Sequence, residues 1–161
     1  MPSPSSADWD AATRAALRLL AVRARSCHEI VDRLRRRGFA AEVISGVVQN
    51  LTARGLVDDR AFALHHARTR VQSRHISSRR LQGELRDKGV AEEIVKATVR
   101  EVFQEINEEE IARAGAARRL KALGRLSPNV VRRRLAAYLL RRGFSSETVR
   151  RTVTTLVKDK Y

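Results

Sequence analysis

The sequence predicts an all-α protein built from three tandem three-helix repeats, and three observations lead to this prediction. Arginine and alanine are the most frequent of the 161 residues, and both, like the leucine and glutamate that accompany them, favour helices. Only three prolines and eight glycines are present, too few for the many turns of a β-sheet protein. A glycine-centred motif also returns three times, as LRRRGF (34–39), LRDKGV (85–90) and LLRRGF (139–144).

The repeat extends well beyond these motifs. Gly38, Gly89 and Gly143 lie 51 and 54 residues apart. An apolar residue stands four positions before each motif's leucine, a glutamate stands four positions after each glycine, and further apolar residues coincide beyond it. The matching sets are Ile30, Leu81 and Leu135; Glu42, Glu93 and Glu147; Val48, Val99 and Val153; and Leu51, Val102 and Leu156. Apolar periodicity that returns three times is typical of a helical repeat protein.

Each repeat is expected to contain three helices, with the glycine between the second and the third. The first helices are expected at 11–24, 58–73 and 107–123, the second at 26–37, 77–88 and 129–142, and the third at 40–54, 91–106 and 145–158. Start signals support these positions: Asp58-Asp59 and Glu108–Glu110 favour helix N-termini. Ser127-Pro128 resembles an N-cap followed by proline at the first helical position, and Gly124 before it is a helix stop.

The glycine motif itself predicts a Schellman turn. With Gly38 as the left-handed residue after the helix, Leu34 and Phe39 become the apolar pair that this turn brings together. Glycine is favoured there because a Cβ is unfavourable in the left-handed conformation. The first helix–turn–helix lacks a polar cap after its glycine, in FAAEV.

Domain boundaries follow from the repeat. We expect a flexible N-terminal leader over 1–10 and three-helix repeats over 11–55, 56–106 and 107–161. A unit of about 50 residues buries little surface alone, so neighbouring repeats must pack on each other or be supported by a partner. Because contacts in such arrays are local, the sequence predicts an elongated or curved array.

The net charge is +15, with 33 basic and 18 acidic residues. It is uneven: +6 over residues 11–54, +2 over 56–106 and +9 over 107–161. Of the basic residues 28 are arginine, which suits bidentate contacts to phosphate or carboxylate; a GC-rich genome would also explain that preference, although not the net excess. The excess indicates an anionic partner such as nucleic acid or a nucleoprotein.

The same residues argue against several classes of protein. Cys27 is the single cysteine, which leaves no disulfide framework and no paired-cysteine zinc site. No apolar run reaches the ~18–20 residues of a membrane span, and the N-terminal residues lack the features of a secretory signal. No GxxxxGK loop is present, and adjacent His65 and His66 cannot converge on a metal from one helix face. We therefore expect a cytoplasmic, non-enzymatic protein without cofactor, metal, membrane or small-molecule substrate.

Basic residues around the glycine motifs are the candidate contacts with a partner. They load the second helices of the outer repeats, and the middle repeat offsets them with Glu84 and Asp87. The candidates are Arg33, Arg36, Arg37, Arg79, Arg80, Lys88, Arg132, Arg133, Arg141 and Arg142. Those in the last turn of a helix also favour its dipole, and a solvated charged face is the other interpretation. The acids needed to balance the outer repeats are missing, which favours a contact surface.

A DNA-binding helix–turn–helix is a further alternative, because the turn is short and contains glycine. None of the third helices has a polar face specialised for base edges; that of the first repeat is AAEVISGVVQNLTAR. Contact with phosphates is therefore favoured over sequence-specific binding.

Over residues 11–161 the chain resembles the RecX family, regulators of the recombinase RecA. The resemblance rests on ALRLLAVRARSCHEIVDRLRRRGF, GLVDDRAFA, RHISSRRLQGELRDKGV and LLRRGFSSETVRR, in that order. It implies tandem three-helix repeats that bind in the groove of the RecA–DNA filament across neighbouring RecA protomers. It also implies inhibition of the recombinase, ATPase and co-protease activities in DNA repair, DNA recombination and the SOS response, with weak binding to single- or double-stranded DNA in some members.

The resemblance supplies no catalytic residues, so the basic candidates are expected to contact acidic RecA surface or filament DNA. One alternative function is a direct, non-specific nucleic-acid-binding helical module that needs no RecA. A structural helical adaptor is another, but it offers no explanation for a charge of +15.

Overall fold

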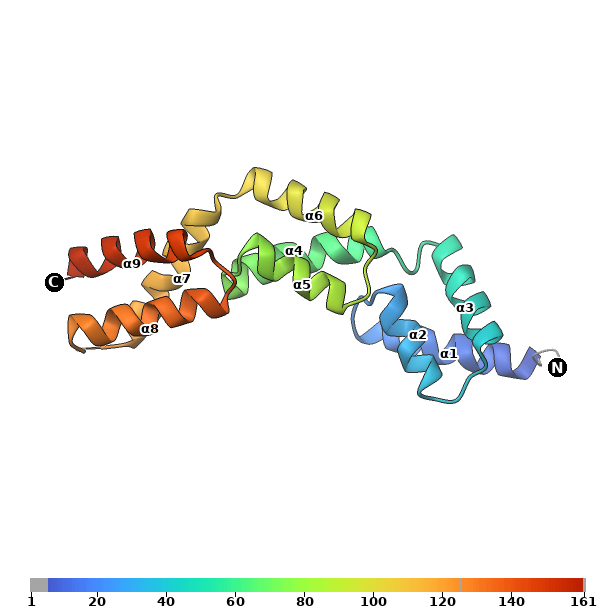
Figure 1. Ribbon diagram of the computed structural model, residues 1–161. Coiled ribbons are helices and arrows are strands. Elements are labelled where there is room, and N and C mark those ends of the chain that lie inside the picture. The colour runs from blue at the N-terminus through green and yellow to red at the C-terminus, as the bar shows by residue number, and fades with distance from the viewer. Residues whose placement is uncertain (1–5, 125, 161) are drawn as a thin grey trace. The chain divides into compact units, whose positions relative to one another are not determined.

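The computed structural model describes residues 6–124 and 126–160. Over these residues the chain forms nine α-helices and no strand (Figure 1), which confirms the predicted fold class. The helices are α1 (Ser6–Val22), α2 (Cys27–Arg35), α3 (Ala41–Ala53), α4 (Asp59–Arg74), α5 (Ser78–Asp87), α6 (Glu92–Glu105), α7 (Glu108–Ala122), α8 (Pro128–Arg141) and α9 (Ser146–Lys160).

Helix α1 is the element whose start differs most from the prediction. It begins at Ser6, so the predicted leader over 1–10 is too long; residues 1–5 lie outside the described part. Trp9 explains the difference, because it packs against the apolar cluster formed by α1, α2 and α3. A Cβ on Gly46 of α3 would lie 2.5 Å from the Trp9 ring, so glycine at this position lets the indole approach the helix.

The predicted helix starts at Asp58 and Pro128 are confirmed. The Asp58 carboxylate accepts hydrogen bonds from the backbone N–H groups of Arg60 (2.8 Å) and Ala61 (3.0 Å), which satisfies two donors at the start of α4. Pro128 occupies the first turn of α8 as expected, although the Ser127 side chain makes no capping hydrogen bond. The start of α8 is therefore favoured by the proline, because proline has no N–H that would be left without a partner in the first turn.

All three glycine motifs form the predicted Schellman turn. The Phe39 N–H donates to the Leu34 carbonyl (3.4 Å) and the Gly38 N–H to the Arg35 carbonyl (2.9 Å), and the other two motifs repeat both bonds. The backbone φ is 84° at Gly38, 69° at Gly89 and 87° at Gly143. The leucines that precede these turns are fully buried: Leu34, Leu85 and Leu139.

The chain divides into two compact units. As far as it is described, unit 1 comprises the chain up to Ala63 together with Leu85–Val95, and unit 2 comprises Leu64–Glu84 together with the chain from Lys96 onward. The predicted middle repeat is therefore shared between the two units. The repeat boundaries at residues 55 and 106 stay predictions.

Each unit has its own apolar core. In unit 1 the helices α1, α2 and α3 enclose a cluster that includes Ala12, Ala16, Ile30, Leu34, Val43, Val47 and Leu51. In unit 2 the helices α7, α8 and α9 pack against one another (Figure 1). Their buried residues include Ile111, Ala112, Ala116, Val131, Leu135, Leu139, Val149 and Val157.

A second contact in each unit places a glycine turn on a buried serine, and we call it the turn-on-serine contact. In unit 1 the hydroxyl of Ser26, just before α2, donates to the carbonyl of Lys88 (2.6 Å). In unit 2 the backbone N–H of Ser77, just before α5, donates to the carbonyl of Arg142 (3.0 Å). Both serines are fully buried. Each turn therefore packs where an earlier helix begins.

The surroundings of the three glycines differ accordingly. A Cβ on Gly89 would lie 2.2 Å from the His28 ring, and one on Gly143 would lie 2.5 Å from the Ser77 hydroxyl. A Cβ on Gly38 would meet nothing within 4 Å. Glycine is thus required twice over at Gly89 and Gly143, for the left-handed turn and for the close approach.

Candidate partner-binding surface

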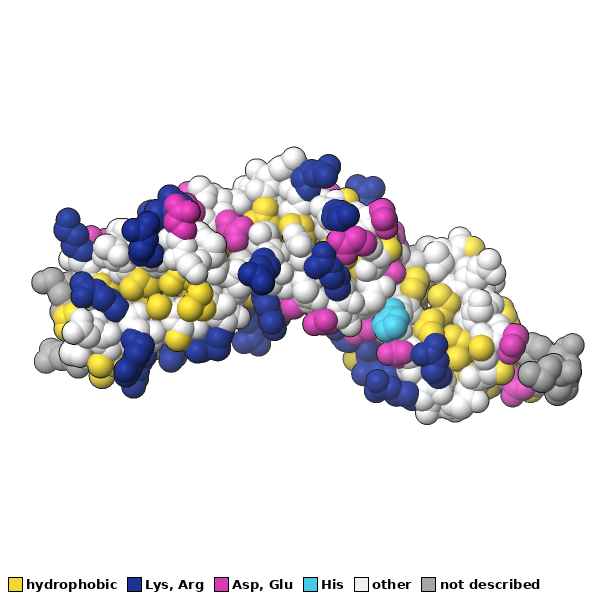
Figure 2. All heavy atoms as spheres, viewed as in Figure 1, with side chains coloured by type: hydrophobic (Ala, Val, Ile, Leu, Met, Phe, Trp, Pro, Cys, Tyr) yellow, Lys and Arg dark blue, Asp and Glu magenta, His cyan; other side chains and the backbone are white. Residues whose placement is uncertain are grey.

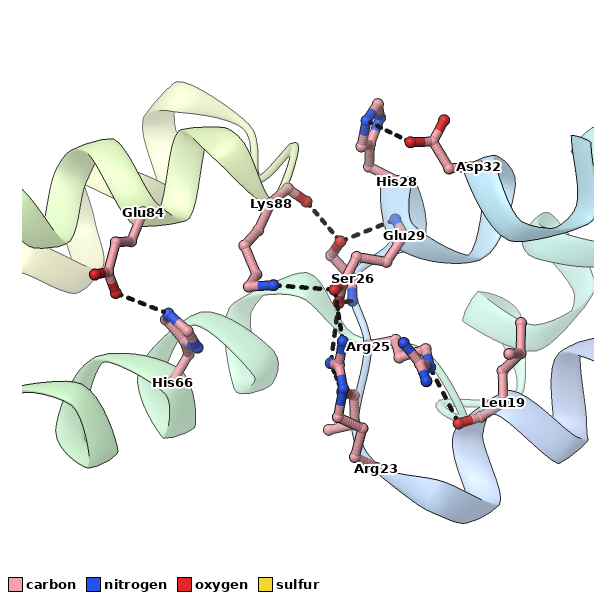
Figure 3. Close-up of polar contacts among 11 residues, drawn as sticks. Leu19, Arg23, Arg25, Ser26, His28, Glu29, Asp32, His66, Glu84 and Lys88 are labelled. Carbon is pink, nitrogen blue, oxygen red and sulfur yellow. Dashed lines mark hydrogen bonds and ion pairs between the residues drawn. The ribbon is translucent and has the colours of Figure 1, made fainter. Parts of the chain in front are cut away.

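An ion-pair cluster lies beside the turn-on-serine contact of unit 1 (Figure 3). Glu29 accepts hydrogen bonds from Arg23 (2.7 Å) and from the Lys88 ammonium (3.0 Å). Ser26 and Glu29 also form a reciprocal capping box at the start of α2. Burial alone would raise the pKa of Glu29, but the hydrogen bonds and charges of Arg23 and Lys88 outweigh it and hold the pKa at about 2. The cation of this turn is therefore neutralised inside unit 1.

Unit 2 carries arginines at the corresponding positions. The repeat spacing puts Arg80 in the place of Glu29 and Arg142 in the place of Lys88. The Arg142 guanidinium stacks over the Tyr138 ring, 4.9 Å from its centroid, and donates a hydrogen bond to the Arg74 carbonyl. Among the described residues no carboxylate forms an ion pair with Arg142. The corresponding turn of unit 2 therefore carries a cation that no carboxylate of the described residues neutralises.

A groove of about 450 Å³ lies between α5 and α8 in unit 2. We call it the α5/α8 groove, and its lining residues are Arg79, Arg80, Gly83, Leu140, Arg141, Gly143, Phe144, Ser145 and Ser146. Arg79, Arg80 and Arg141 were all predicted contacts, and the structure brings them together across two helices. This lining contains three arginines and no acid.

One partly buried acid, Glu84, borders this region without neutralising it. Its carboxylate accepts two hydrogen bonds from Arg70, both of 2.6 Å, and lies 3.4 Å from Arg80 and 3.5 Å from His66. Burial alone would raise the pKa of Glu84, but the hydrogen bond and charge of Arg70, with its neighbours, lower it. One carboxylate is shared among two arginines and a histidine, so a positive excess remains.

An apolar patch with a basic rim lies between α8 and α9. The cavity there measures about 420 Å³ and is lined by Ala136, Leu140, Val149 and Val153 together with Arg132, Arg133 and Arg150. Leu140 is 52% exposed and also lines the α5/α8 groove. Figure 2 shows apolar side chains gathered over α8 and α9 with basic side chains beside them. The predicted pair Arg132 and Arg133 thus flanks an exposed apolar surface.

In unit 1 the predicted arginines lie around the end of α2. Arg33, Arg36 and Arg37 are exposed, and within the described ranges none of the three forms an ion pair. The adjacent Arg35 instead lies 3.4 Å from Asp32. This cluster fits a partner-contacting surface, which stays a prediction, whereas Lys88 is already bonded to Glu29.

Sequence reasoning missed the partners that decide which cations are neutralised. Glu29 and Ser26 could have been found, because Ser-x-x-Glu before an apolar run is a capping-box signal. The residues that surround Arg142 carry no such signal: Arg74 and Tyr138 come from different helices, and only the folded chain brings them together.

Two classes of site find no support in the described residues. None of their histidine, cysteine, aspartate and glutamate side chains gather in a group of three or more that could hold a metal ion. None of their helices has the length and apolar character needed to cross a membrane.

The fold and surface define a tandem three-helix repeat protein with un-neutralised arginines. The chain belongs to the RecX family, since three family models match it in order: the first three-helix domain of RecX over residues 12–51, the second over 58–99 and the third over 107–153.

Relatives named "Regulatory protein RecX" support this assignment. The protein from Thermobifida fusca is 39% identical over 156 residues, which cover 94% of this chain and 83% of that protein. The protein from Amycolatopsis mediterranei is 38% identical over 126 residues, covering 78% and 71% respectively. The crystal structure of RecX from Lactobacillus salivarius matches with a TM-score of 0.76 at 20% identity, covering 96% of this chain and 99% of that one, which supports the fold.

Proposed function

We propose that the protein is a non-enzymatic, cytoplasmic inhibitor of RecA that binds in the groove of the RecA–DNA filament. In that role it hinders recombination and the filament's ATPase and co-protease activities during DNA repair and the SOS response. Membership of the RecX family and the name "Regulatory protein RecX" carried by its relatives support this proposal.

The observation that carries it is the basic α5/α8 groove. Arg79, Arg80 and Arg141 line one cavity without an acid in its lining, while Lys88 at the equivalent turn of unit 1 is bonded to Glu29. Since like charges held together destabilise a fold, this arrangement favours contact with an acidic surface or with phosphates. Leu140 at the same groove adds an exposed apolar contact.

Charge reversal in the groove tests the proposal. We expect Arg79→Glu/Arg141→Glu to weaken binding to RecA filaments by about tenfold or more, because charged pairs at an interface contribute more than exposed pairs within a chain. The control Arg100→Glu/Arg113→Glu changes the net charge equally at exposed positions on α6 and α7. Fluorescence anisotropy at moderate salt, on filaments assembled on labelled single-stranded DNA with a slowly hydrolysed ATP analogue, measures both. Equal losses in the two variants would overturn the groove as the contact.

The alternative is a direct nucleic-acid-binding module. Both functions predict binding that weakens with salt, so the discriminating comparison uses the same labelled single strand, naked or coated with RecA. Much tighter binding to the coated strand supports the RecA regulator, and equal binding supports the module.

A further inference from the structure

A third cavity in unit 2 joins the predicted Arg142 with three arginines that the repeat pattern did not indicate. It measures about 260 Å³, and its lining residues are Ser73, Arg74, His75, Arg118, Arg119, Ala122, Tyr138 and Arg142. Four arginines from α4, α7 and the end of α8 therefore surround one space, and the lining contains no aspartate or glutamate. We call it the four-arginine pocket.

The guanidinium groups of this pocket have no acidic partner among the described residues. Arg74, Arg118, Arg119 and Arg142 form no ion pair there, whereas other arginines of the same residues do, for example Arg70 with Glu84 and Arg86 with Glu92. Four like charges around one cavity repel one another, and this repulsion is relieved when an anion enters.

His75, which lines the pocket, has an unfavourable backbone conformation. His75 has φ of 51°, the one non-glycine residue with positive φ in the described chain. Left-handed backbone at a non-glycine residue is strained, and such strain gathers at functional sites. This conformation lies directly between α4 and Ser77, where the chain must bring His75 beside α7.

A helix-interior glycine completes the wall of the pocket. Gly115 lies within α7, where glycine is unfavourable because of its backbone freedom. A Cβ at this position would lie 2.8 Å from the His75 Cβ and 3.3 Å from the Tyr138 hydroxyl. Glycine is therefore needed so that both side chains can approach α7, beside Arg118 and Arg119.

Contacts within the chain hold the Arg142 guanidinium in position. Arg142 stacks on Tyr138 and donates to the Arg74 carbonyl, so the guanidinium is held in place before any ligand arrives. Such pre-organisation reduces the conformational entropy that binding would otherwise remove. Burial, together with the charges of Arg118 and Arg142, lowers the pKa of His75.

We propose that the four-arginine pocket binds a phosphate group. Each guanidinium offers N–H donors in a planar fork, and Ser73, Tyr138 and His75 add donors of their own. This number of donors exceeds what the two oxygens of a carboxylate accept, but it suits the several charged oxygens of a phosphate. The cavity has room for a phosphate and its waters, since a water molecule takes about 30 Å³ of liquid.

The phosphate has two possible sources, and both are tested without RecA. Tripolyphosphate represents a free phosphate compound, and a short single-stranded oligonucleotide represents a phosphodiester backbone. The site deepens the proposed function by naming a ligand chemistry, but failure of RecA binding and failure of phosphate binding remain separate results.

The variant for this test is Arg118→Gln/Arg119→Gln, at two exposed positions of α7, with Arg113→Gln/Arg134→Gln as a control of equal charge change. Isothermal titration calorimetry is expected to show binding of at least one probe to the full chain. The pocket variant should weaken it by about tenfold or more, since two charge-assisted hydrogen bonds are removed, and the control should change it by less than about twofold. Circular dichroism melting checks that both variants fold.

Each outcome decides the proposal. Loss of tripolyphosphate binding alone assigns the pocket to free phosphate compounds, loss of oligonucleotide binding alone assigns it to backbone phosphate, and loss of both supports a general phosphate site. Equal losses in pocket and control variants, or no saturable binding of either probe, would overturn it. A hexaglutamate peptide that bound as tightly, with the same dependence on Arg118 and Arg119, would also overturn the phosphate assignment.

Discussion

The two turn-on-serine contacts join equivalent positions of the repeat, but they differ in the donor group and in charge. In unit 1 the turn before Gly89 rests on Ser26, and its Lys88 is bonded to Glu29. In unit 2 the turn before Gly143 rests on Ser77, and Arg80 stands where an acid would neutralise Arg142. The glycine turn thus packs on the serine with either pattern of charge. The charged positions around them are free to serve either stability or binding.

The helix that follows Ser77 also lacks the charges that would stabilise its start. α5 has no acidic residue in its first turn, whereas α2 has Glu29 there. Arginine near the positive end of a helix dipole is unfavourable. The charges at the start of α5 in unit 2 are therefore less favourable for the helix than those at the start of α2 in unit 1.

The largest expected effect concerns the glycines. Gly38→Ala should lower the free energy of unfolding by about 1 kcal/mol, because a Cβ is strained in the left-handed conformation but meets no neighbour. Gly89→Ala should lower it by about 3 kcal/mol or more, because the same strain is joined by overlap with His28. Urea unfolding followed by circular dichroism measures both. Equal losses at the two glycines would show that Gly89 is not packed closely against His28.

The next effect concerns the serine itself. Ser26→Ala should lower the free energy of unfolding by about 2 kcal/mol, because a helix cap is lost and the Lys88 carbonyl loses its buried donor. Ser145→Ala is the matched control: its hydroxyl caps Thr148 (3.1 Å) at an exposed position, with a loss of about 1 kcal/mol or less expected. A Ser26 variant no less stable than the Ser145 variant would contradict the contact's role.

The ion pairs of unit 1 make a pH-dependent contribution. Because the pKa of Glu29 falls from 4.5 to about 2 on folding, its contribution is fully present above about pH 4.5 and is lost as the pH falls toward 2. We expect about 1–2 kcal/mol, reduced by the partial exposure of Arg23. Glu29→Gln should be less stable than the wild type at neutral pH and should flatten the dependence between pH 4.5 and 2. A parallel pH profile in the variant would refute this coupling.

Local sequence patterns were enough to predict most of the fold. The Schellman turns, the buried leucines and helix ends such as Asp58 follow from short-range chemistry, so they were visible as motifs. The early start of α1 was not, because it depends on Trp9 packing against Gly46, which is a contact between distant positions.

The candidate site was only partly predictable for the same reason. Clusters such as Arg79 and Arg80 are visible in the sequence, but whether a cation is neutralised depends on residues far along the chain. Glu29 and Lys88 are 59 residues apart, and Arg74 and Arg142 are 68 residues apart. A repeat alignment shows equivalent positions; it does not show which of them meet.

The smallest expected effect converts the unit 2 contact toward that of unit 1. Arg80→Glu puts a glutamate three residues after Ser77, which favours the helix dipole and offers Arg142 a partner; the Ser77 N–H already donates to the Arg142 carbonyl, so no capping box forms. We expect a gain of about 1 kcal/mol in the free energy of unfolding, reduced by repulsion from Glu84. Arg79→Glu makes the same charge change one position earlier, at a position that does not correspond to Glu29 of unit 1, and should gain about half as much. If Arg80→Glu is both more stable and weaker in filament binding, arginine at this position is retained for binding at the expense of stability; a variant no more stable than the wild type would show that the two contacts differ for a reason other than charge.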